Sequence, residues 1–212
     1  MTYFLAVFLA FLQSAPPILN NLIDGVNRTF ARMRDFSADF VQIEQNSLNQ
    51  RTSAAGHLYM ARPKKTRWEY KKPEEKLFVS DGKVISMYIP ADRQVRQDQV
   101  KDAADDRIPL MFLVGQTNLR GEFEKFTILP QKPEVEGTVV IRMYPRRKTE
   151  LAELIMEVDP KTYLIRRLVM KHSDGITRDF QFSNIKTNGK LPESLFKFTP
   201  PAGVRVVEGI GR

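Results

Sequence analysis

The sequence has no cysteine among its 212 residues, only two histidines and one tryptophan. The absence of cysteine excludes disulfide bonds, thiolate metal sites, a cysteine nucleophile and a lipid-modified cysteine. Three motifs with known chemistry are also missing: the Gly-x-Ser-x-Gly elbow, the Walker-type phosphate loop and the His-Glu-x-x-His zinc motif. Any enzyme activity would therefore need acid and base groups that these patterns do not reveal.

The few residues able to do acid–base or metal chemistry stand apart from one another. His57 and His172 each lie among strand-like residues, where a lone histidine is more typically exposed or hydrogen-bonded than catalytic. Asp102, Asp105 and Asp106 lack the glycine and distal glutamate of a calcium loop, and are typical of a helix start. We expect no catalytic residue, no metal site and no cofactor.

The composition is that of one globular domain with a basic surface. Hydrophobic residues make up 42% and charged residues 27%, and the net charge is +8. Such a charge allows a nucleic acid, an anionic lipid surface or an acidic protein as partner, or simply a basic surface. The basic cluster between Arg62 and Lys72 includes Trp68 and Tyr70, a mixture that can bind single strands. No RNA-binding motif accompanies it, so we expect no nucleic-acid partner.

The first fifteen residues differ from the rest. They carry no charged side chain, and residues 4–12 form an apolar run of the length of a signal-peptide core. The run is too short to span a bilayer. It lacks a preceding Lys or Arg, and Pro16 disfavours cleavage after Ala15. We expect an export signal over residues 1–15 and one domain over 16–212; the alternative is an uncleaved amphipathic or anchoring N-terminus.

Two segments have helical patterns. Apolar residues recur at spacings of three and four from Ile18 to Arg34, giving one apolar stripe that either packs on a sheet or covers a pocket. Residues 108–115 are almost entirely apolar, with Pro109 suited to a first turn and Gly115 to a C-cap. This second helix must be buried or must cover an apolar ligand.

Most of the remaining chain alternates apolar and polar residues with the period of a strand. Residues 45–55 are polar and predict a loop or frayed hairpin end, and residues 91–107 show no strand pattern. Asp81–Gly82 predicts a two-residue type I′ hairpin turn. The sum is eight to eleven short antiparallel strands with helices on one face, as in a curved sheet or open barrel.

Methionines are spread through these elements, about one to each. They occur on the predicted strands and on both predicted helices. Methionine fills irregular gaps in a core, and it also suits surfaces that accept variable apolar ligands. Ordinary core packing and a cavity for acyl chains both remain open on this evidence.

The segment from Gly56 to Lys83 resembles a known family. Its pattern G-x-L-x-x-x-R-P-x-x-x-R-W-x-Y, followed by V-S-D-G-K, is similar to that of the outer-membrane lipoprotein carrier (LolA) family. Residues 36–40 (FSADF), the apolar residues 109–114 and residues 198–204 (FTPPAGV) extend the resemblance in the same order. It covers roughly residues 22 to 207.

The resemblance implies a mainly β fold: an unclosed antiparallel β-barrel of about eleven strands, with helices as a lid over an apolar cavity. It implies a periplasmic carrier, not an enzyme. Such a carrier takes acylated lipoproteins from an inner-membrane ABC transporter and passes them to an outer-membrane receptor or membrane. The receptor of similar fold is itself a lipoprotein and needs a cysteine to carry its lipid. Because this chain has no cysteine, it resembles the carrier rather than the receptor. We expect a monomer.

The resemblance also assigns residues. The family's lid arginine, which hydrogen-bonds main-chain oxygens of the lid helices, falls on Arg62. At the position of an aromatic residue that often faces the family's cavity, this chain has Thr66 instead. Strand parity and composition add nine candidates for the acyl-chain cavity: Phe40, Leu58, Trp68, Met87, Met111, Phe112, Met143, Met156 and Met170. The alternative function is binding or transport of another lipid, such as a phospholipid or glycolipid, or lipid sensing on the same fold.

Overall fold

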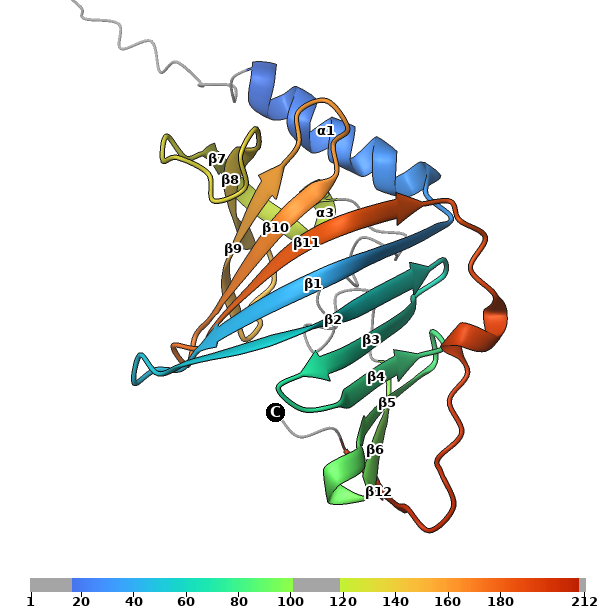
Figure 1. Cartoon of the computed structure of the whole chain (residues 1–212). Coiled ribbons are helices and arrows are strands. Elements are labelled where there is room, and N and C mark those ends of the chain that lie inside the picture. The colour runs from blue at the N-terminus through green and yellow to red at the C-terminus, as the bar shows by residue number, and fades with distance from the viewer. Residues whose placement is uncertain (1–16, 101–118, 210–212) are drawn as a thin grey trace, which may run out of the picture.

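A single twelve-stranded sheet forms the body of the protein (Figure 1). The computed structural model describes residues 17–100 and 119–209. The first six strands are β1 (Asp35–Gln45), β2 (Arg51–Ala61), β3 (Lys65–Lys72), β4 (Lys76–Ser80), β5 (Val84–Ile89) and β6 (Gln94–Gln99). The other six are β7 (Phe123–Ile128), β8 (Val139–Pro145), β9 (Leu151–Val158), β10 (Ile165–His172), β11 (Thr177–Thr187) and β12 (Arg205–Glu208).

The strand order shows why the sheet stays open. It runs β12-β6-β5-β4-β3-β2-β1-β11-β10-β9-β8-β7, so β12 and β7 form two edges that do not pair with each other. The central strand β1 joins the halves, because it pairs with β2 on one side and β11 on the other. The predicted mainly β, unclosed, curved sheet is confirmed, with twelve strands in place of about eleven.

The last strand departs from the expected antiparallel arrangement. β12 pairs with β6 in parallel, with Val206 opposite Val95. The connection from β11 passes along the strand ends through the 3₁₀-helix η2 (Glu193–Phe196) before reaching β6 (Figure 1).

Helix α1 (Pro17–Arg32) agrees within two residues with the predicted helix. Its apolar stripe packs into the same hydrophobic cluster as the large side chains of one sheet face, which we call the inner face. The stripe consists of Leu19, Leu22, Ile23, Val26 and Phe30, followed by Met33 just past the helix. The only other helical segments described are α3 (Leu119–Glu122), η1 (Pro90–Asp92) and η2. The helix predicted over residues 108–115 lies outside the described residues.

Two polar segments that were not predicted as strands are strands. β2 begins at Arg51, so part of the loop predicted over residues 45–55 is a hairpin arm paired with β1. β6 lies within residues 91–107, and Val95 is its one buried side chain. β6 and the Arg51 end of β2 are held by main-chain ladders with little apolar burial. Hydrophobic alternation therefore gives no signal for them.

The turn at Asp81–Gly82 is real, but it is not type I′. Three residues separate β4 from β5, and only Gly82 has a positive φ, at 97°. Asp81 Oδ1 accepts hydrogen bonds from the main-chain N–H groups of Lys83 (2.8 Å) and Val84 (2.9 Å). The aspartate therefore closes the turn through its side chain, in the manner of an Asx turn.

Candidate functional site

The inner face carries a cluster of aromatic rings centred on Trp68. The ring centroid of Trp68 lies 5.0 Å from that of Phe40 and 5.4 Å from that of Phe180, both in edge-on geometry. Tyr70 meets Phe40 in the same way, at 4.9 Å. Because side chains two residues apart on a strand share a face, β1, β3 and β11 together deliver these rings to one place.

The structure gathers the predicted cavity residues that it describes. Six of them are buried in the inner-face cluster, and Met87 lies partly buried against it. The six buried ones are Phe40, Leu58, Trp68, Met143, Met156 and Met170. Met111 and Phe112 lie outside the described residues. Whether these side chains contact acyl chains stays a prediction.

Several inner-face residues were missing from the predicted set. Phe180 and Phe182 of β11 are buried in the cluster, as is Met60 of β2. All three have the correct strand parity, so the alternation in β11 and β2 could have found them. Buried Thr66 is another omission, and its position two residues before Trp68 is the signal.

Arg62 holds the C-terminal end of α1. Its Nε donates to the carbonyl oxygen of Met33 at 3.1 Å, and its Nη2 donates to that of Phe30 at 2.8 Å. Its main-chain N–H also donates to the carbonyl of Arg34 at 3.0 Å. The last carbonyls of a helix have no partner within the helix and lie at the negative end of its dipole. A guanidinium is well suited to this place because it presents several donors and a positive charge.

The N-terminal half of α1 is held separately. Arg120 of α3 donates from Nη2 to Asn20 Oδ1 at 2.9 Å and from Nε to Asp24 Oδ1 at 3.3 Å. Asn27 Oδ1 accepts from the main-chain N–H of Leu119 at 2.9 Å. The sequence predicted none of these contacts, because they join segments about 95 residues apart. α1 is thus fixed along its length by polar contacts as well as by its apolar stripe.

Polar side chains bound the apolar area at the hairpin end of the sheet. The Tyr70 hydroxyl donates to Gln42 Oε1 at 2.7 Å, and Arg178 Nε donates to Glu44 Oε2 at 2.8 Å. Burial raises the pKa of Tyr70, which keeps its hydroxyl protonated as a donor. His172 lies within 3.3 Å of Arg178 Nη1, so this histidine belongs to the boundary.

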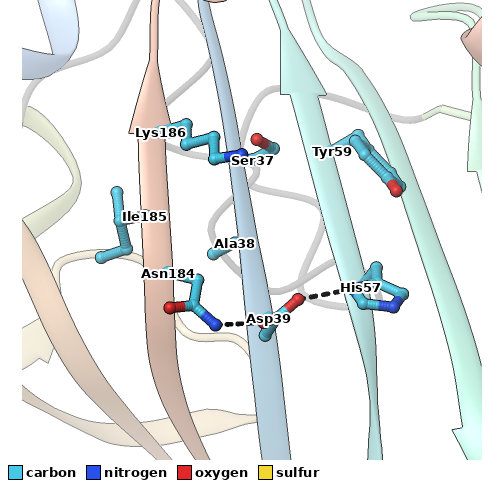
Figure 2. A pocket seen from close by; sticks show the side chains of 8 residues that line it. All are labelled: Ser37, Ala38, Asp39, His57, Tyr59, Asn184, Ile185 and Lys186. Carbon is cyan, nitrogen blue, oxygen red and sulfur yellow. Dashed lines mark hydrogen bonds and ion pairs between the residues drawn. The ribbon is translucent and has the colours of Figure 1, made fainter.

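A polar pocket of about 530 Å³ lies on the opposite, outer face (Figure 2). Asp39 sits between His57 Nδ1, at 2.5 Å, and Asn184 Nδ2, at 2.6 Å, as Figure 2 shows. Hydrogen bonds from Asn184 and then His57 lower the pKa of Asp39. Ser37 also lines the pocket, but no hydrogen bond joins its hydroxyl to His57 in the described structure. The geometry is that of a paired surface carboxylate, not of an activated nucleophile.

The basic cluster is partly neutralised on the outer face. Lys65 pairs with Glu193, and Arg67 Nε donates to Glu69 Oε1 at 2.5 Å. Arg67 Nη1 also donates to the carbonyl of Leu195 at 3.2 Å. These two cations therefore bind the C-terminal segment to the sheet. Their role is at least partly structural.

Neither a metal centre nor a membrane span is found in the part of the chain that the structure describes. No three His, Asp or Glu side chains in residues 17–100 and 119–209 are grouped so that they could hold a metal ion. None of the helices in these ranges is long and apolar enough to cross a bilayer.

Comparison with known proteins identifies relatives over most of the chain. The model of the family described as "Outer membrane lipoprotein carrier protein LolA" matches residues 31–199. A protein of Nitrosospira multiformis named outer-membrane lipoprotein carrier protein is 30% identical over 95% of each chain. One of the same name from Chromobacterium violaceum is 31% identical over 83% of this chain and 82% of its own.

Solved structures show the same fold at lower identity. An uncharacterised conserved protein from Thermus thermophilus superposes with a TM-score of 0.54 and 17% identity. The match covers 90% of this chain and 98% of the other. This likeness concerns the fold alone.

Proposed function

Because the chain belongs to the outer-membrane lipoprotein carrier (LolA) family, we propose that it shields the acyl chains of lipoproteins on its inner face while they cross the periplasm. One observation carries the proposal. Helix α1 packs on the apolar inner face, and carbonyls at its C-terminal end are held by the side chain of Arg62. A helix held in this way can leave the sheet without breaking any strand pairing. The proposed role is transport and involves no reaction.

The energetics favour a cover that competes with the cargo. Each buried methylene contributes about 0.8 kcal/mol, so one acyl chain contributes on the order of 10 kcal/mol. Lifting α1 exposes its apolar stripe, at roughly 1.5–3 kcal/mol per side chain. The free energy gained by burying an acyl chain is therefore largely offset by the free energy lost when the stripe of α1 is exposed. Hydrogen bonds from Arg62, roughly 1.5–3 kcal/mol each for a charged donor, then favour the closed, empty state and promote release.

The proposal extends to the route of the cargo. We propose residues 1–15 as an export signal for the domain over residues 16–212, supported by the uncharged apolar run at residues 4–12. An inner-membrane ABC transporter would supply the lipoprotein, and an outer-membrane receptor or membrane would accept it. The family resemblance supports these partners.

Arg62→Leu tests the release step. We expect the variant, purified from periplasm, to carry more acylated protein than wild type and to transfer less of it to acceptor outer membranes, because the closed state has lost its hydrogen bonds. Arg67→Leu is the matched control, since Arg67 also donates to a main-chain carbonyl but lies on the outer face. Normal transfer by Arg62→Leu would refute the role of this latch. Mass spectrometry of the co-purified material identifies the cargo, and free phospholipid in place of acylated protein would refute the lipoprotein assignment.

A further inference from the structure

Two buried polar atoms on β3 have no hydrogen-bond partner among residues 17–100 and 119–209. They are the hydroxyl Oγ1 of Thr66 and the indole Nε1 of Trp68. Thr66 is 1% exposed and Trp68 is 2% exposed, so solvent does not satisfy either atom. Buried donors are nearly always paired in folded proteins. Two unpaired donors within three residues therefore need an explanation.

Both side chains point into the inner face. Thr66 is paired with Met60 of β2, and Trp68 is paired with Leu58. Met60 and Leu58 both belong to the inner-face cluster. Residues two apart on a strand share a face, with Cα atoms about 7 Å apart. The two unpaired groups thus lie side by side within the proposed acyl-chain site.

Within the part of the chain that the structure describes, neither group is paired by its neighbours. The Trp68 ring is packed edge-on against Phe40 and Phe180, which have no acceptor atoms. Ser80, the register partner of Thr66 on β4, accepts a hydrogen bond from the main-chain N–H of Gly82 at 3.1 Å, and in the described structure it makes none with Thr66 Oγ1. A group that enters with the ligand can pair both donors.

The chemistry of the donors restricts that group. An indole N–H only donates, so its partner must be an acceptor, and a hydroxyl can donate to the same kind of atom. A charged acceptor such as a phosphate or carboxylate would be strongly disfavoured among aromatic and aliphatic side chains. Among the groups of an acylated lipid, the neutral acceptors next to the methylene chain are the ester and amide carbonyl oxygens.

We propose that Thr66 Oγ1 and Trp68 Nε1 donate hydrogen bonds to the carbonyl oxygens of the ester or amide linkages that attach the acyl chains. This inference rests on the proposed carrier function and adds recognition of the acyl linkage to it. The two donors set how deeply a chain enters the inner face. In the empty protein both donors are unpaired within the described residues. Pairing them with a carbonyl therefore favours loading, in addition to the hydrophobic contribution.

The test compares ester with ether linkages. The probes are a tripalmitoylated lysine-rich lipopeptide and its analogue with two ether-linked chains, each titrated by displacement of a fluorescent apolar dye. We expect wild type to bind the ester probe about three- to tenfold more tightly, the range of one net hydrogen bond. Thr66→Val should weaken ester binding by a similar factor, leave ether binding unchanged and raise the melting temperature of the empty protein. Replacing Trp68 by its benzothiophene analogue, which lacks only the N–H, should act likewise on binding.

Controls separate this inference from the carrier function. Thr138→Val makes the same chemical change at a hydroxyl that already bonds to Val135 and Glu157, so it should leave the ester-to-ether ratio unchanged. Equal affinity of wild type for both probes would overturn the carbonyl site while leaving the carrier function intact. Failure of both probes to bind would overturn both. Diester and diether phosphatidylethanolamine form a second pair, and the pair that shows the ester preference identifies the source of the carbonyl.

Discussion

Half-buried Arg62 and buried Glu157 show two different uses of a charge. The charge of Arg62 lies at the C-terminal end of α1, whereas that of Glu157 lies in a network on the outer face. Glu157 is 1% exposed and accepts from the main-chain N–H groups of Val135 (2.8 Å) and Glu134 (3.1 Å), and from Arg167 (2.6 Å). Arg167 also pairs with Asp179 at 2.7 Å. The network ties β9, β10 and β11 to the loop before β8.

Glu157→Gln should lower stability in a pH-dependent way. Burial raises the pKa of Glu157, but the hydrogen bonds from Val135, Arg167 and Glu134 outweigh it and leave the pKa below its ordinary value. A lowered pKa in the folded state gives stability that is present above the unfolded value, about 4.3, and is lost as pH falls through the folded pKa. In urea denaturation we expect a loss of about 2–4 kcal/mol at pH 7, shrinking below about pH 4.

A matched carboxylate tests this assignment. Glu153→Gln removes one partner of the ion pair with Lys171, whose side chain is 47% exposed, and should lose less than about 1 kcal/mol. A loss for Glu157→Gln that is equal at pH 7 and pH 3 would contradict the electrostatic account.

At the scale of elements, Gly25 determines how closely α1 approaches the loop between β9 and β10. A Cβ atom at this position would lie 2.2 Å from the Tyr163 ring, and three ring atoms lie within 2.6 Å. Since the ring base itself is among these atoms, rotation of the ring tip cannot relieve the clash. Glycine in mid-helix is normally unfavourable, so here it reflects packing.

Gly25→Ala should therefore destabilise the protein, although alanine has the better helix propensity. We expect a loss of about 1–3 kcal/mol in the free energy of unfolding, as for other overpacked positions. In a Tyr163→Ala background the same change should be neutral or stabilising, because the space is then open. A double-mutant cycle measures this coupling, and additive effects would contradict the close contact.

The elements also show which parts of the structure the sequence could predict. α1 and strands such as β1 bury one face more than the other, so their apolar period was readable. β6 and the Arg51 end of β2 were not predicted, because they are stabilised by main-chain pairing with few buried side chains. The parallel pairing of β12 was missed because a local pattern does not specify a distant partner.

The candidate site also has features that the sequence could predict and features that it could not. Parity placed Phe40, Leu58 and Trp68 on one face correctly. It could not show that Arg120 contacts Asn20 or that Thr66 lacks a hydrogen-bond partner, because both depend on the packing of segments distant in the chain. The hydrogen bonds from Arg62 to α1 follow the family resemblance rather than any periodicity.

On the scale of the whole molecule, the sheet and helix α1 are held by different kinds of contact. The twelve strands are joined by main-chain ladders, and the outer face has its own small cluster of Val140, Ile155 and Val169. α1 packs its apolar stripe on the inner face and makes further contacts with α3 and the β9–β10 loop, but it forms no ladder with any of the described strands. We therefore propose that the helix exchanges places with acyl chains while the sheet persists, as reversible loading requires.

Trp68 gives the most direct test of this account, because it is the only tryptophan and lies at the centre of the inner face. Bromine atoms on an acyl chain quench tryptophan fluorescence only at contact range. We expect a triacylated lipopeptide with brominated chains to quench Trp68 saturably, and the unbrominated lipopeptide to do so far less. Binding of the brominated lipopeptide, established by calorimetry, without quenching would place the acyl chains elsewhere and contradict the account.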